Sequence, residues 1–491
     1  MTTHYSVSSR SSVVDTPAWP EPETTTETRF PTDFVWGAGT AAFQIEGSTR
    51  ADGRGVSIWD TFTAQPGRIH GGDTGDPAAD HYRRYHEDVA LLRSMGVDHY
   101  RFSLAWPRIQ PTGSGPANPA GLDFYDRLVD DLLAAGIQPW PTLYHWDLPQ
   151  PLEDAGGWPA RDTALRFAEY AAIAHQRLGD RVTAWSTMNE PWVAAFLGYA
   201  SGQHAPGRRE PAAALAAAHH LLLGHGLAAT AIREQGTPTI GITLNTQPIR
   251  PNDGTVADID AARRVDGIRN RFFLDPLYHG RYPDDVRADL AGITDLGFVR
   301  EGDLPTIAAP LDFLGVNYYS PAWVAGSAEG IDPRLLEPDG VGADYVGCDD
   351  VTMLRGTEDR TDQDWAVDPG GLTEMLVRLA VDYPGLPLYV TECGASYRDE
   401  VGSDGTVRDT DRRAFLASHV RATHTALRAG APVKGFFVWT LLDNFEWAYG
   451  YSERFGIVYV DYETQARIVK DSGHWYGELA KTGVLPATGS E

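Results

Sequence analysis

The stretch LPLYVTECG, residues 386–394, shows the sequence pattern from which the fold can be predicted. Apolar residues run almost without interruption to Val390, and a carboxylate, Glu392, stands where the run ends. A near-continuous apolar run is typical of a strand buried on both faces, as the strands of a parallel sheet are. The stretch therefore predicts a buried parallel strand with a polar residue at its carboxyl end.

Seven further stretches have this form, and helical stretches separate them. The strand candidates are FVWGAGTAAFQIEG from Phe34, VDHYRFSLAW from Val97, IQPWPTLYHWD from Ile137, TAWSTMNEP from Thr183, TIGITLNTQP from Thr239, LDFLGVNYYS from Leu311 and VKGFFVWTLLDN from Val433. The clearest helical stretches are HYRRYHEDVALLRSM, AGLDFYDRLVDDLLAAG, DTALRFAEYAAIAHQRLG and DRRAFLASHVRATHTALRAG. Because parallel strands need crossover helices, the pattern predicts a single (β/α)₈ TIM barrel with elaborated βα loops. A doubly wound open sheet is the alternative, but no GxGxxG follows the first strand.

The barrel prediction leaves two segments outside the regular pattern. Residues 1–28 are rich in Ser, Thr, Pro and Glu, which bury too little surface to order a chain, so they are predicted to be a flexible tail. Residues 29–491 then form the catalytic barrel. Within it, Pro321 to Pro369 is too long for a plain connection and is expected to be an elaborated loop over one face.

The composition limits the classes of partner. The formal charge is −26, from 67 acidic and 41 basic residues, which argues against a nucleic acid or an anionic membrane. No apolar run is expected to reach the length of a transmembrane helix, and the N-terminus lacks the apolar core of a secretory signal. A cytoplasmic location is therefore expected. The two cysteines give no disulfide framework and no CxxC zinc motif. Nothing in the sequence predicts the oligomeric state.

Polar and aromatic side chains gather at the predicted strand ends, where a (β/α)₈ barrel carries its active site. They are Gln44, Glu46, Arg101, His145, Trp146, Asp147, Asn189, Glu190, Asn317, Tyr319, Glu392, Trp439, Glu446 and Trp447. Strand ends are polar in any case, which explains two or three of these residues but not a dozen. Tryptophans suit the C–H face of a sugar ring, and amides and carboxylates suit its hydroxyls. The set therefore indicates a carbohydrate site.

Glu190 and Glu392 are the candidate working pair. Glycoside hydrolysis needs one acid to protonate the leaving oxygen and a second carboxylate to attack the anomeric carbon or to activate water. Either residue alone is as well explained by a helix cap or a surface ion pair. On the fourth and seventh strands, however, the two are expected to face each other across one barrel mouth.

The ordered motifs resemble those of glycoside hydrolase family 1, and of its bacterial β-glucosidases in particular. They are WGAGTAAFQIEG, YRFSLAWPRI, LYHWDLP, TMNEP, GVNYYS, TECG and LLDNFEWAYGY, spread from about Phe30 to about Gly477. The resemblance implies a retaining β-glycosidase that needs no cofactor and no metal. Such an enzyme takes small β-glucosides, among them cello-oligosaccharides and aryl or alkyl glucosides.

The resemblance also implies roles for the residues. Glu190 would be the acid/base and Glu392 the nucleophile, held and oriented by Arg101 and Tyr319. The remaining substrate-binding candidates are Gln44, His145, Trp146, Asn189, Asn317, Trp439, Glu446 and Trp447. From charge alone, Arg101 and Tyr319 are expected to lower the pKa of Glu392, and Glu392 is expected to raise that of Glu190.

One departure from the family pattern lies beside the nucleophile. The family usually has Asn where this chain has Cys393. Adjacent strand residues point to opposite faces, so Cys393 is expected to point away from the barrel mouth and to be structural.

Several alternatives remain open or disfavoured. Glu446 would repel a substrate 6-phosphate, which disfavours a phospho-β-glycosidase, and a thioglucosidase would carry Gln at position 190. A catalytically inactive sugar-binding barrel would lack one of the two carboxylates. A metal-dependent hydrolase would need more ligands than His145 and Asp147; His219 and His220 lie in a helix, as packing or surface residues. The choice among glucose, galactose and fucose, the aglycone, and transglycosylation stay open.

Overall fold

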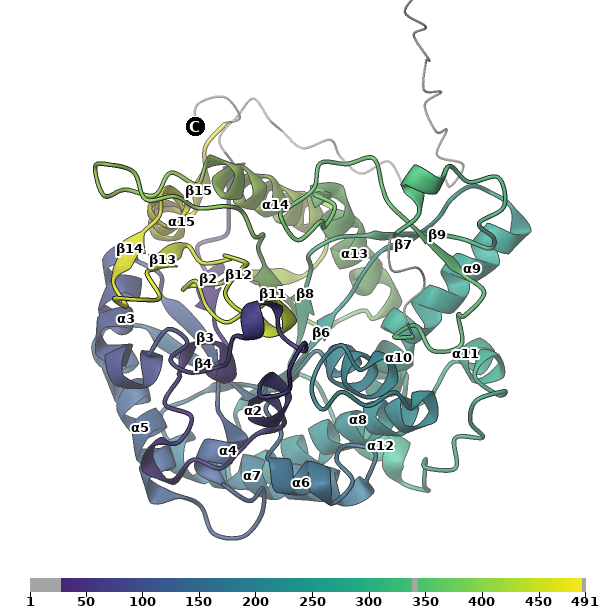
Figure 1. Ribbon diagram of the computed structural model, residues 1–491, viewed down its shortest axis with the longest axis horizontal. Coiled ribbons are helices and arrows are strands. Elements are labelled where there is room, and N and C mark those ends of the chain that lie inside the picture. Colours follow the sequence, from purple (N-terminus) through teal and green to yellow (C-terminus); the bar gives the residue numbers. More distant parts are fainter. Residues whose placement is uncertain (1–27, 338–342, 488–491) are drawn as a thin grey trace, which may run out of the picture.

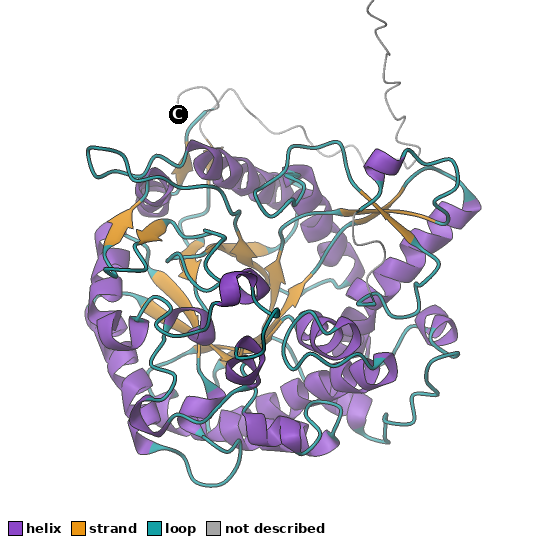
Figure 2. Ribbon diagram, in the orientation of Figure 1, coloured by secondary structure: helices purple, strands orange, loops and turns teal. Residues whose placement is uncertain are grey.

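The computed structural model describes residues 28–337 and 343–487, and eight parallel strands close into a barrel at its centre (Figures 1 and 2). The barrel strands are β2 (Val35–Gly39), β3 (His99–Ser103), β4 (Gln138–Tyr144), β5 (Ala184–Asn189), β6 (Thr239–Asn245), β8 (Phe313–Asn317), β11 (Leu388–Cys393) and β12 (Val433–Trp439). They follow one another around the barrel in chain order, and β12 closes on β2. The predicted (β/α)₈ barrel is confirmed, with one strand inside each predicted stretch.

Aromatic side chains fill the lower end of the barrel. Trp140 packs against Phe313 and Phe437 at ring-centroid distances of 5.1 and 5.4 Å. Gly37 is required beside this cluster, since a Cβ at that position would lie 2.2 Å from the Phe437 ring. Because the amino ends of the strands are plugged, a ligand can enter the barrel only from the carboxyl ends.

Helices surround the barrel on all sides (Figure 2). The longer ones are α3 (His81–Met95), α5 (Pro119–Ala134), α7 (Arg161–Leu178), α8 (Pro211–Arg233), α9 (Val256–Asp266), α10 (Phe272–His279), α13 (Pro369–Asp382), α14 (Thr410–Arg428) and α15 (Asp471–Thr482). Shorter ones lie in the loops: α1 (Ala42–Ile45), α2 (Ile58–Thr63), α4 (Trp106–Ile109), α6 (Gln150–Asp154), α11 (Asp284–Asp289), α12 (Asp303–Ile307) and the π-helices η3 (Val193–Ser201) and η4 (Gly267–Arg271).

The helix α8 departs from the expectation that no run reaches membrane-spanning length. Among the described residues it is the one helix that is long and apolar enough to cross a membrane, by length and composition. However, 78% of its apolar window is buried inside the protein, where it packs on α7 and η3. His219 and His220 are buried in it and do not reach the surface; His219 bonds Tyr282 and Asp303. The helix is apolar because it lies in the core.

The long connection between β8 and α13 builds a small sheet outside the barrel. Its strands β9 (Ala322–Ala325) and β10 (Thr352–Leu354) pair with each other, and β9 also pairs with β7 (Ile249–Pro251) from the loop after β6. Figure 1 places β7 and β9 beyond the barrel, near α9. Two βα loops far apart in the sequence are thereby tied together over one side of the barrel mouth.

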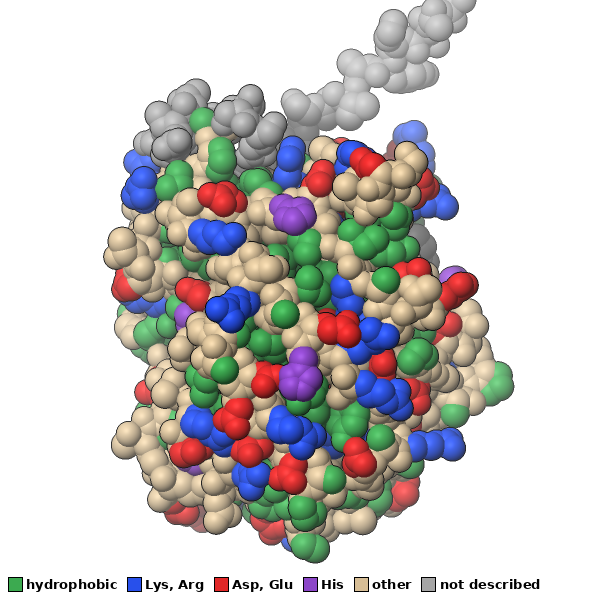
Figure 3. Space-filling view, turned by 90° about the vertical axis from the view of Figure 1, so that its left-hand side faces the viewer, with side chains coloured by type: hydrophobic (Ala, Val, Ile, Leu, Met, Phe, Trp, Pro, Cys, Tyr) green, Lys and Arg blue, Asp and Glu red, His purple; other side chains and the backbone are tan. Residues whose placement is uncertain are grey.

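The chain ends meet at the predicted tail boundary. Thr28 and Arg29 form β1, which pairs with β15 (Val484–Leu485). Thr28, the last residue of the predicted tail, lies in this strand, and residues 1–27 lie outside the described part. A further hairpin, β13 (Val458–Val460) with β14 (Arg467–Val469), follows the loop after β12. On the face in Figure 3, acidic and basic side chains are interspersed.

Candidate active site

A pocket of about 320 Å³ opens at the carboxyl ends of the barrel strands. Nine predicted residues line it: His145, Trp146, Glu190, Asn317, Tyr319, Glu392, Trp439, Glu446 and Trp447. Three more, Gln44, Arg101 and Asn189, lie behind the wall, each bonded to a lining residue. Glu46 and Asp147 are not among the lining residues; Glu46 is instead ion-paired with Arg108.

The sequence suggested that Gln44 ends the first strand, but the structure places it outside that strand. β2 ends at Gly39, and Gln44 lies in the short helix α1. Its Nε2 donates to Asn444 Oδ1 and Phe445 O, both at 3.0 Å, and to Glu446 Oε2 at 3.2 Å. The helical turn thus brings Gln44 to the loop after β12. Its Oε1 is buried without a hydrogen-bond partner among the described residues.

Glu392 at the end of β11 is held by two side chains. Arg101 Nη1 donates to Oε1 at 2.7 Å, and the Tyr319 hydroxyl donates to Oε2 at 2.6 Å. Both oppose the effect of burial, yet burial is the larger influence and raises the pKa of Glu392. The two side chains lower the pKa as expected, but the net shift is upward, because desolvation of a carboxylate in a pocket cannot be derived from the motif.

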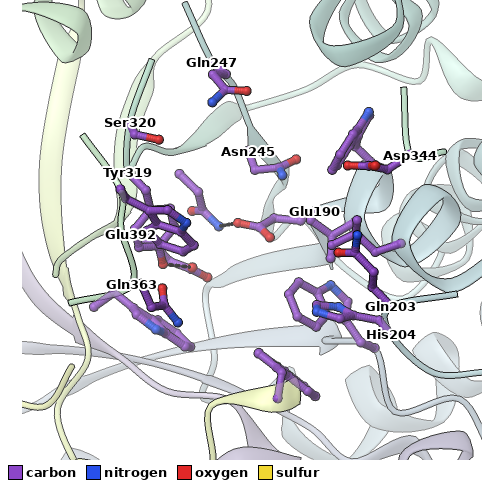
Figure 4. Close-up of a pocket in the computed structure, with 18 of the residues that line it drawn as sticks. Glu190, Gln203, His204, Asn245, Gln247, Tyr319, Ser320, Asp344, Gln363 and Glu392 are labelled. Atoms are coloured by element: carbon purple, nitrogen blue, oxygen red, sulfur yellow. Dashed lines mark hydrogen bonds between the residues drawn. The ribbon is translucent and has the colours of Figure 1, made fainter. Parts of the chain in front are cut away.

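Glu190 follows β5 with a positive φ of 49°, an uncommon conformation for a residue other than glycine. Its Oε1 accepts a hydrogen bond from Asn317 Nδ2 at 2.6 Å. Burial, and next the charge of Glu392, raise the pKa of Glu190 to about 8. The two carboxyl groups face one another across the pocket (Figure 4). Trp146 and Trp447 also have positive φ, so strained backbone is concentrated at this pocket.

A hydrogen-bond chain connects the two halves of the site. Asn189 Oδ1 accepts from Arg101 Nη2 at 2.6 Å and from Asn317 Nδ2 at 3.0 Å, and its Nδ2 lies 3.1 Å from His145 Nε2. Thr391 completes the chain by donating to Asn317 Oδ1 at 2.8 Å. Asn317 thus donates to Glu190 and to Asn189, and Asn189 in turn accepts from Arg101, which also donates to Glu392. These bonds fix the orientations of the Asn189 and Asn317 side-chain amides.

Aromatic rings form the floor of the pocket around His145. Its ring stacks on Trp439 and Trp447, with centroids 5.7 and 5.8 Å apart, and Trp146 packs on Trp447 at 4.5 Å. Glu446 precedes Trp447, and burial, followed by the charge of Glu392, raises its pKa to about 8. Flat rings beside an acid and an amide can bind the two faces and the hydroxyl groups of a sugar ring.

The outer pocket wall contains residues that the sequence reasoning missed. Among them are Trp192, Gln203, His204, Asn245, Gln247, Arg269, Asp344, Tyr345, Gln363 and Trp365. Trp192 stands two residues after Glu190, a signal that was available in the sequence. Gln203 and His204 follow η3, Asn245 is the last residue of β6, and the others come from the segments after β6 and β8, where no regular pattern locates a residue.

Cys393 is completely buried and does not line the pocket. It belongs to the main apolar cluster. It lies near Tyr318 and near Tyr476 of α15, since its charge would raise the pKa of both tyrosines. Burial raises the pKa of the thiol itself. It therefore lies on the helix side of β11, as a neutral thiol. Within the described residues no group of three or more His, Cys, Asp or Glu side chains is placed to hold a metal ion.

The sequence matches glycosyl hydrolase family 1 over residues 26–484. It is 52% identical to a thermostable β-glucosidase B of Thermobispora bispora over 93% of this chain and 91% of that protein. It is 48% identical to a bifunctional β-D-glucosidase/β-D-fucosidase of Bifidobacterium breve over 91% of this chain and 97% of that protein.

Solved structures agree with the sequence comparison. The psychrophilic β-glucosidase of Micrococcus antarcticus superposes with a TM-score of 0.90 at 48% identity, covering 93% of this chain and 98% of that one. The Thermotoga maritima β-glucosidase in complex with glucoimidazole gives 0.86 at 43% identity, covering 93% and 99%. With the family match spanning nearly all of the chain, the conclusion is that this protein belongs to glycosyl hydrolase family 1.

Proposed function

We propose that the protein is a β-glucosidase that hydrolyses terminal, non-reducing β-D-glucosyl residues with retention of configuration. The observation that carries the proposal is the pair of buried carboxyl groups in one pocket. Glu392 is bonded to a cation, and Glu190 has a pKa raised to about 8. One group is equipped to carry negative charge and the other to carry a proton at neutral pH.

In the first step, a carboxylate oxygen of Glu392 attacks the anomeric carbon while Glu190 gives its proton to the leaving oxygen. Arg101 and Tyr319 orient Glu392 and stabilise its charge before the attack. The products are a glycosyl ester on Glu392 and the free aglycone. This assignment needs the two carboxyl groups about 5–5.5 Å apart, the spacing of retaining glycosidases.

In the second step, water attacks the ester and Glu190 takes the proton. Esterification removes the Glu392 charge, so one of the two causes that raise the Glu190 pKa disappears. Glu190 then ionises more readily and acts as a base. The same residue therefore serves as acid and as base because its neighbour changes charge between the steps.

The rest of the pocket is assigned to the glucosyl ring. Trp439, Trp447 and Trp146 supply apolar faces, and Glu446, Gln44 and His145 supply hydrogen bonds. Asn189 and Asn317 lie next to the reacting carboxyl groups, where they are assigned to the 2-hydroxyl group. The presence of both carboxyl groups favours a hydrolase over an inactive sugar-binding barrel. Residues 29–491 are proposed as the catalytic unit.

A β-D-fucosidase activity in the same site is the second candidate, because a relative at 48% identity is named for both activities. Initial rates on nitrophenyl β-glucoside, β-fucoside and β-galactoside separate the candidates. We expect the glucoside to have a kcat/KM at least as high as the fucoside. Cellobiose and short cello-oligosaccharides are the proposed natural substrates, acted on in the cytoplasm.

The mechanism is tested by NMR of the first sugar released from a β-glucoside. Retention predicts that β-glucose appears first and then mutarotates. If α-glucose appears first, Glu392 is not the nucleophile and the double displacement is wrong.

A further inference from the structure

Arg269 is a cation in the wall of the active-site pocket. It lies in the π-helix η4 and shares this wall with Trp192, Gln247, Asp344 and Tyr345. It is on the side of the acid/base, since the Arg269 charge acts to lower the pKa of Glu190 and the Glu190 charge acts to raise that of Arg269. This is the side from which a leaving group takes its proton.

Among residues 28–337 and 343–487 the side chain of Arg269 makes no hydrogen bond and no ion pair, and its Nε is buried without an acceptor. The contrast with Arg271, two residues along η4, is direct. Arg271 donates to Asp266, Asp285 and the Arg263 carbonyl. The chain has a net charge of −26, yet Arg269 in the pocket wall has no ion-pair partner among the described residues. Its guanidinium is therefore available to bind an anionic ligand.

The three most deeply buried arginines among the described residues are paired with carboxylates. Arg101 bonds Glu392, Arg108 bonds Glu46, and Arg412 bonds Asp399 and Asp409. Arg269 is only partly buried because it lines the pocket, so its remaining N–H groups are open to an acceptor on a bound ligand.

The guanidinium of Arg269 lies over an aromatic ring. Its Cζ lies 3.8 Å from the centroid of the Trp192 ring, and Trp192 is itself packed against Phe196 and Tyr345. A guanidinium that stacks by its face keeps its N–H groups in the ring plane, directed sideways. This planar set of donors matches the two oxygens of a carboxylate.

We propose that Arg269 is a specificity-determining residue that binds a carboxylate on the leaving group, so that the enzyme favours aryl β-glucosides with an acidic aglycone. The inference rests on the proposed β-glucosidase activity and names its substrate class. Glu190 does not compete for Arg269 at the start of the reaction, because it then carries its proton. Asp344 lies on the same wall, and its charge acts to raise the pKa of Arg269, so it weakens the attraction for an anion.

The test compares two substrates that differ in charge and little in shape, 4-carboxyphenyl and 4-carbamoylphenyl β-D-glucoside, with the 3-substituted pair alongside. The measured quantity is the ratio of kcat/KM for the carboxylate to that for the amide, taken above the pKa of the carboxyl group. Dividing the wild-type ratio by that of a variant cancels the difference in leaving-group ability. We expect Arg269→Gln to lower the ratio at least tenfold and Arg269→Lys to lower it less.

Two further variants sharpen the result. Arg271→Gln removes a cation from the same helix but from outside the pocket, and we expect its ratio to equal that of the wild type. Asp344→Asn removes the opposing charge, and we expect the ratio to rise several-fold. A melting temperature for each variant identifies any that fold poorly, in which case Asp344→Asn alone decides the sign.

The outcomes are distinct. A ratio that is unchanged in Arg269→Gln, or an Asp344→Asn ratio that stays flat or falls, overturns the assignment. If Arg269→Gln lowers kcat/KM for cellobiose and for the acidic substrates to the same extent, Arg269 binds hydroxyl groups and the assignment is also overturned. If the wild type fails to hydrolyse 4-nitrophenyl β-glucoside, the proposed function fails; if it hydrolyses this substrate without preferring the carboxylates, only the inference fails.

Discussion

Two groups of three carboxyl groups lie at or after the carboxyl ends of barrel strands, and the pKa shifts resolved in them differ in direction. In the first, Asp399, Asp409 and Asp443 surround Arg412 and Lys470, at distances of 2.6 to 2.9 Å. Burial acts to raise the pKa of Asp399, but Lys470 and Arg412 outweigh it and the pKa is lowered. Asp399 therefore stays ionised, and the ion pairs of the group hold the structure together.

In the second group, Glu190, Glu392 and Glu446 share the pocket with one directly bonded cation, Arg101. Burial and the charge of Glu392 raise the pKa of both Glu190 and Glu446 to about 8. Burial acts to raise the pKa of Asp399 as it does that of Glu190 and Glu446, so the opposite net directions follow from the number of bonded cations. A shortage of positive charge is what keeps a proton on the acid that catalysis requires.

The first group also supports the second. Asp443 accepts hydrogen bonds from Lys470 and from the Gly456 amide, and it is followed by the loop that carries Glu446 and Trp447. Arg454, from the far side of this loop, donates to Asp443 at 2.6 Å. Asp443, which is ion-paired, thus helps to fix the loop that carries Glu446, which forms no ion pair among the described residues.

The largest effect on activity is expected when Glu392, the pocket carboxylate that is ion-paired with Arg101, is removed. Glu392→Gly should lower kcat/KM by about 10⁴-fold or more, roughly 5 kcal/mol, because no ester can form. Azide added to this variant should restore turnover and give α-glucosyl azide. Its failure to do so in a folded variant, judged by its circular dichroism, would contradict the nucleophile assignment.

Removing the proton carrier should have a smaller effect that depends on the substrate. Glu190→Ala should lose roughly 10²- to 10⁴-fold on glucosides with poor leaving groups, which need protonation. An activated aryl glucoside should lose less in the first step, and azide should then yield β-glucosyl azide. Equal losses on good and poor leaving groups would rule out the acid role.

Breaking the paired group should affect stability more than chemistry. Lys470 is completely buried, and Lys470→Met leaves Asp399 and Asp443 with one cation fewer. Removing one partner of a buried ion pair costs about 3–5 kcal/mol of unfolding free energy. Denaturant unfolding should show this loss, with Lys434→Met, at an exposed position, as the matched control. Equal stability of the two variants would mean that the group contributes nothing.

The pH profile tests the difference in protonation directly. Glu190 must be protonated and its pKa is about 8, so kcat/KM should fall about tenfold per pH unit above that value. Glu392 must be ionised, so kcat/KM should also fall as the pH drops through its raised pKa. The two limbs belong to the coupled pair. With an activated substrate, Glu190→Gln should lose the basic limb and Glu446→Gln should keep it; the reverse would move the proton to Glu446.

The barrel could be predicted from the sequence because its strands are apolar on both faces, as in LPLYVTECG, and the motifs located the residues at their ends. Gln44 shows the limit: its stretch continues the apolar run of β2, yet Gln44 is helical, and only the loop after β12 explains its position. The raised pKa of Glu392 depends on burial by distant segments. Arg269 gave no signal, because one more arginine in an Arg-rich helical stretch resembles a surface residue until the pocket wall closes around it.

The smallest effect is expected at Cys393, which stands beside Glu392 but outside both groups of carboxyl groups. A catalytic thiol needs a base or a cation that keeps it as a thiolate. Burial instead raises the pKa of Cys393, and Arg101 is bonded to Glu392 and Asn189. Cys393→Ser and Cys393→Asn should therefore keep kcat within about tenfold, or 1.4 kcal/mol. The buried hydroxyl or amide should cost stability, about 1–3 kcal/mol if it finds no partner. Loss of activity without loss of stability, down to the level of Glu392→Gly, would require a chemical role for the thiol. A lower melting temperature with near-normal kcat would identify Cys393 as a packing residue of the barrel wall.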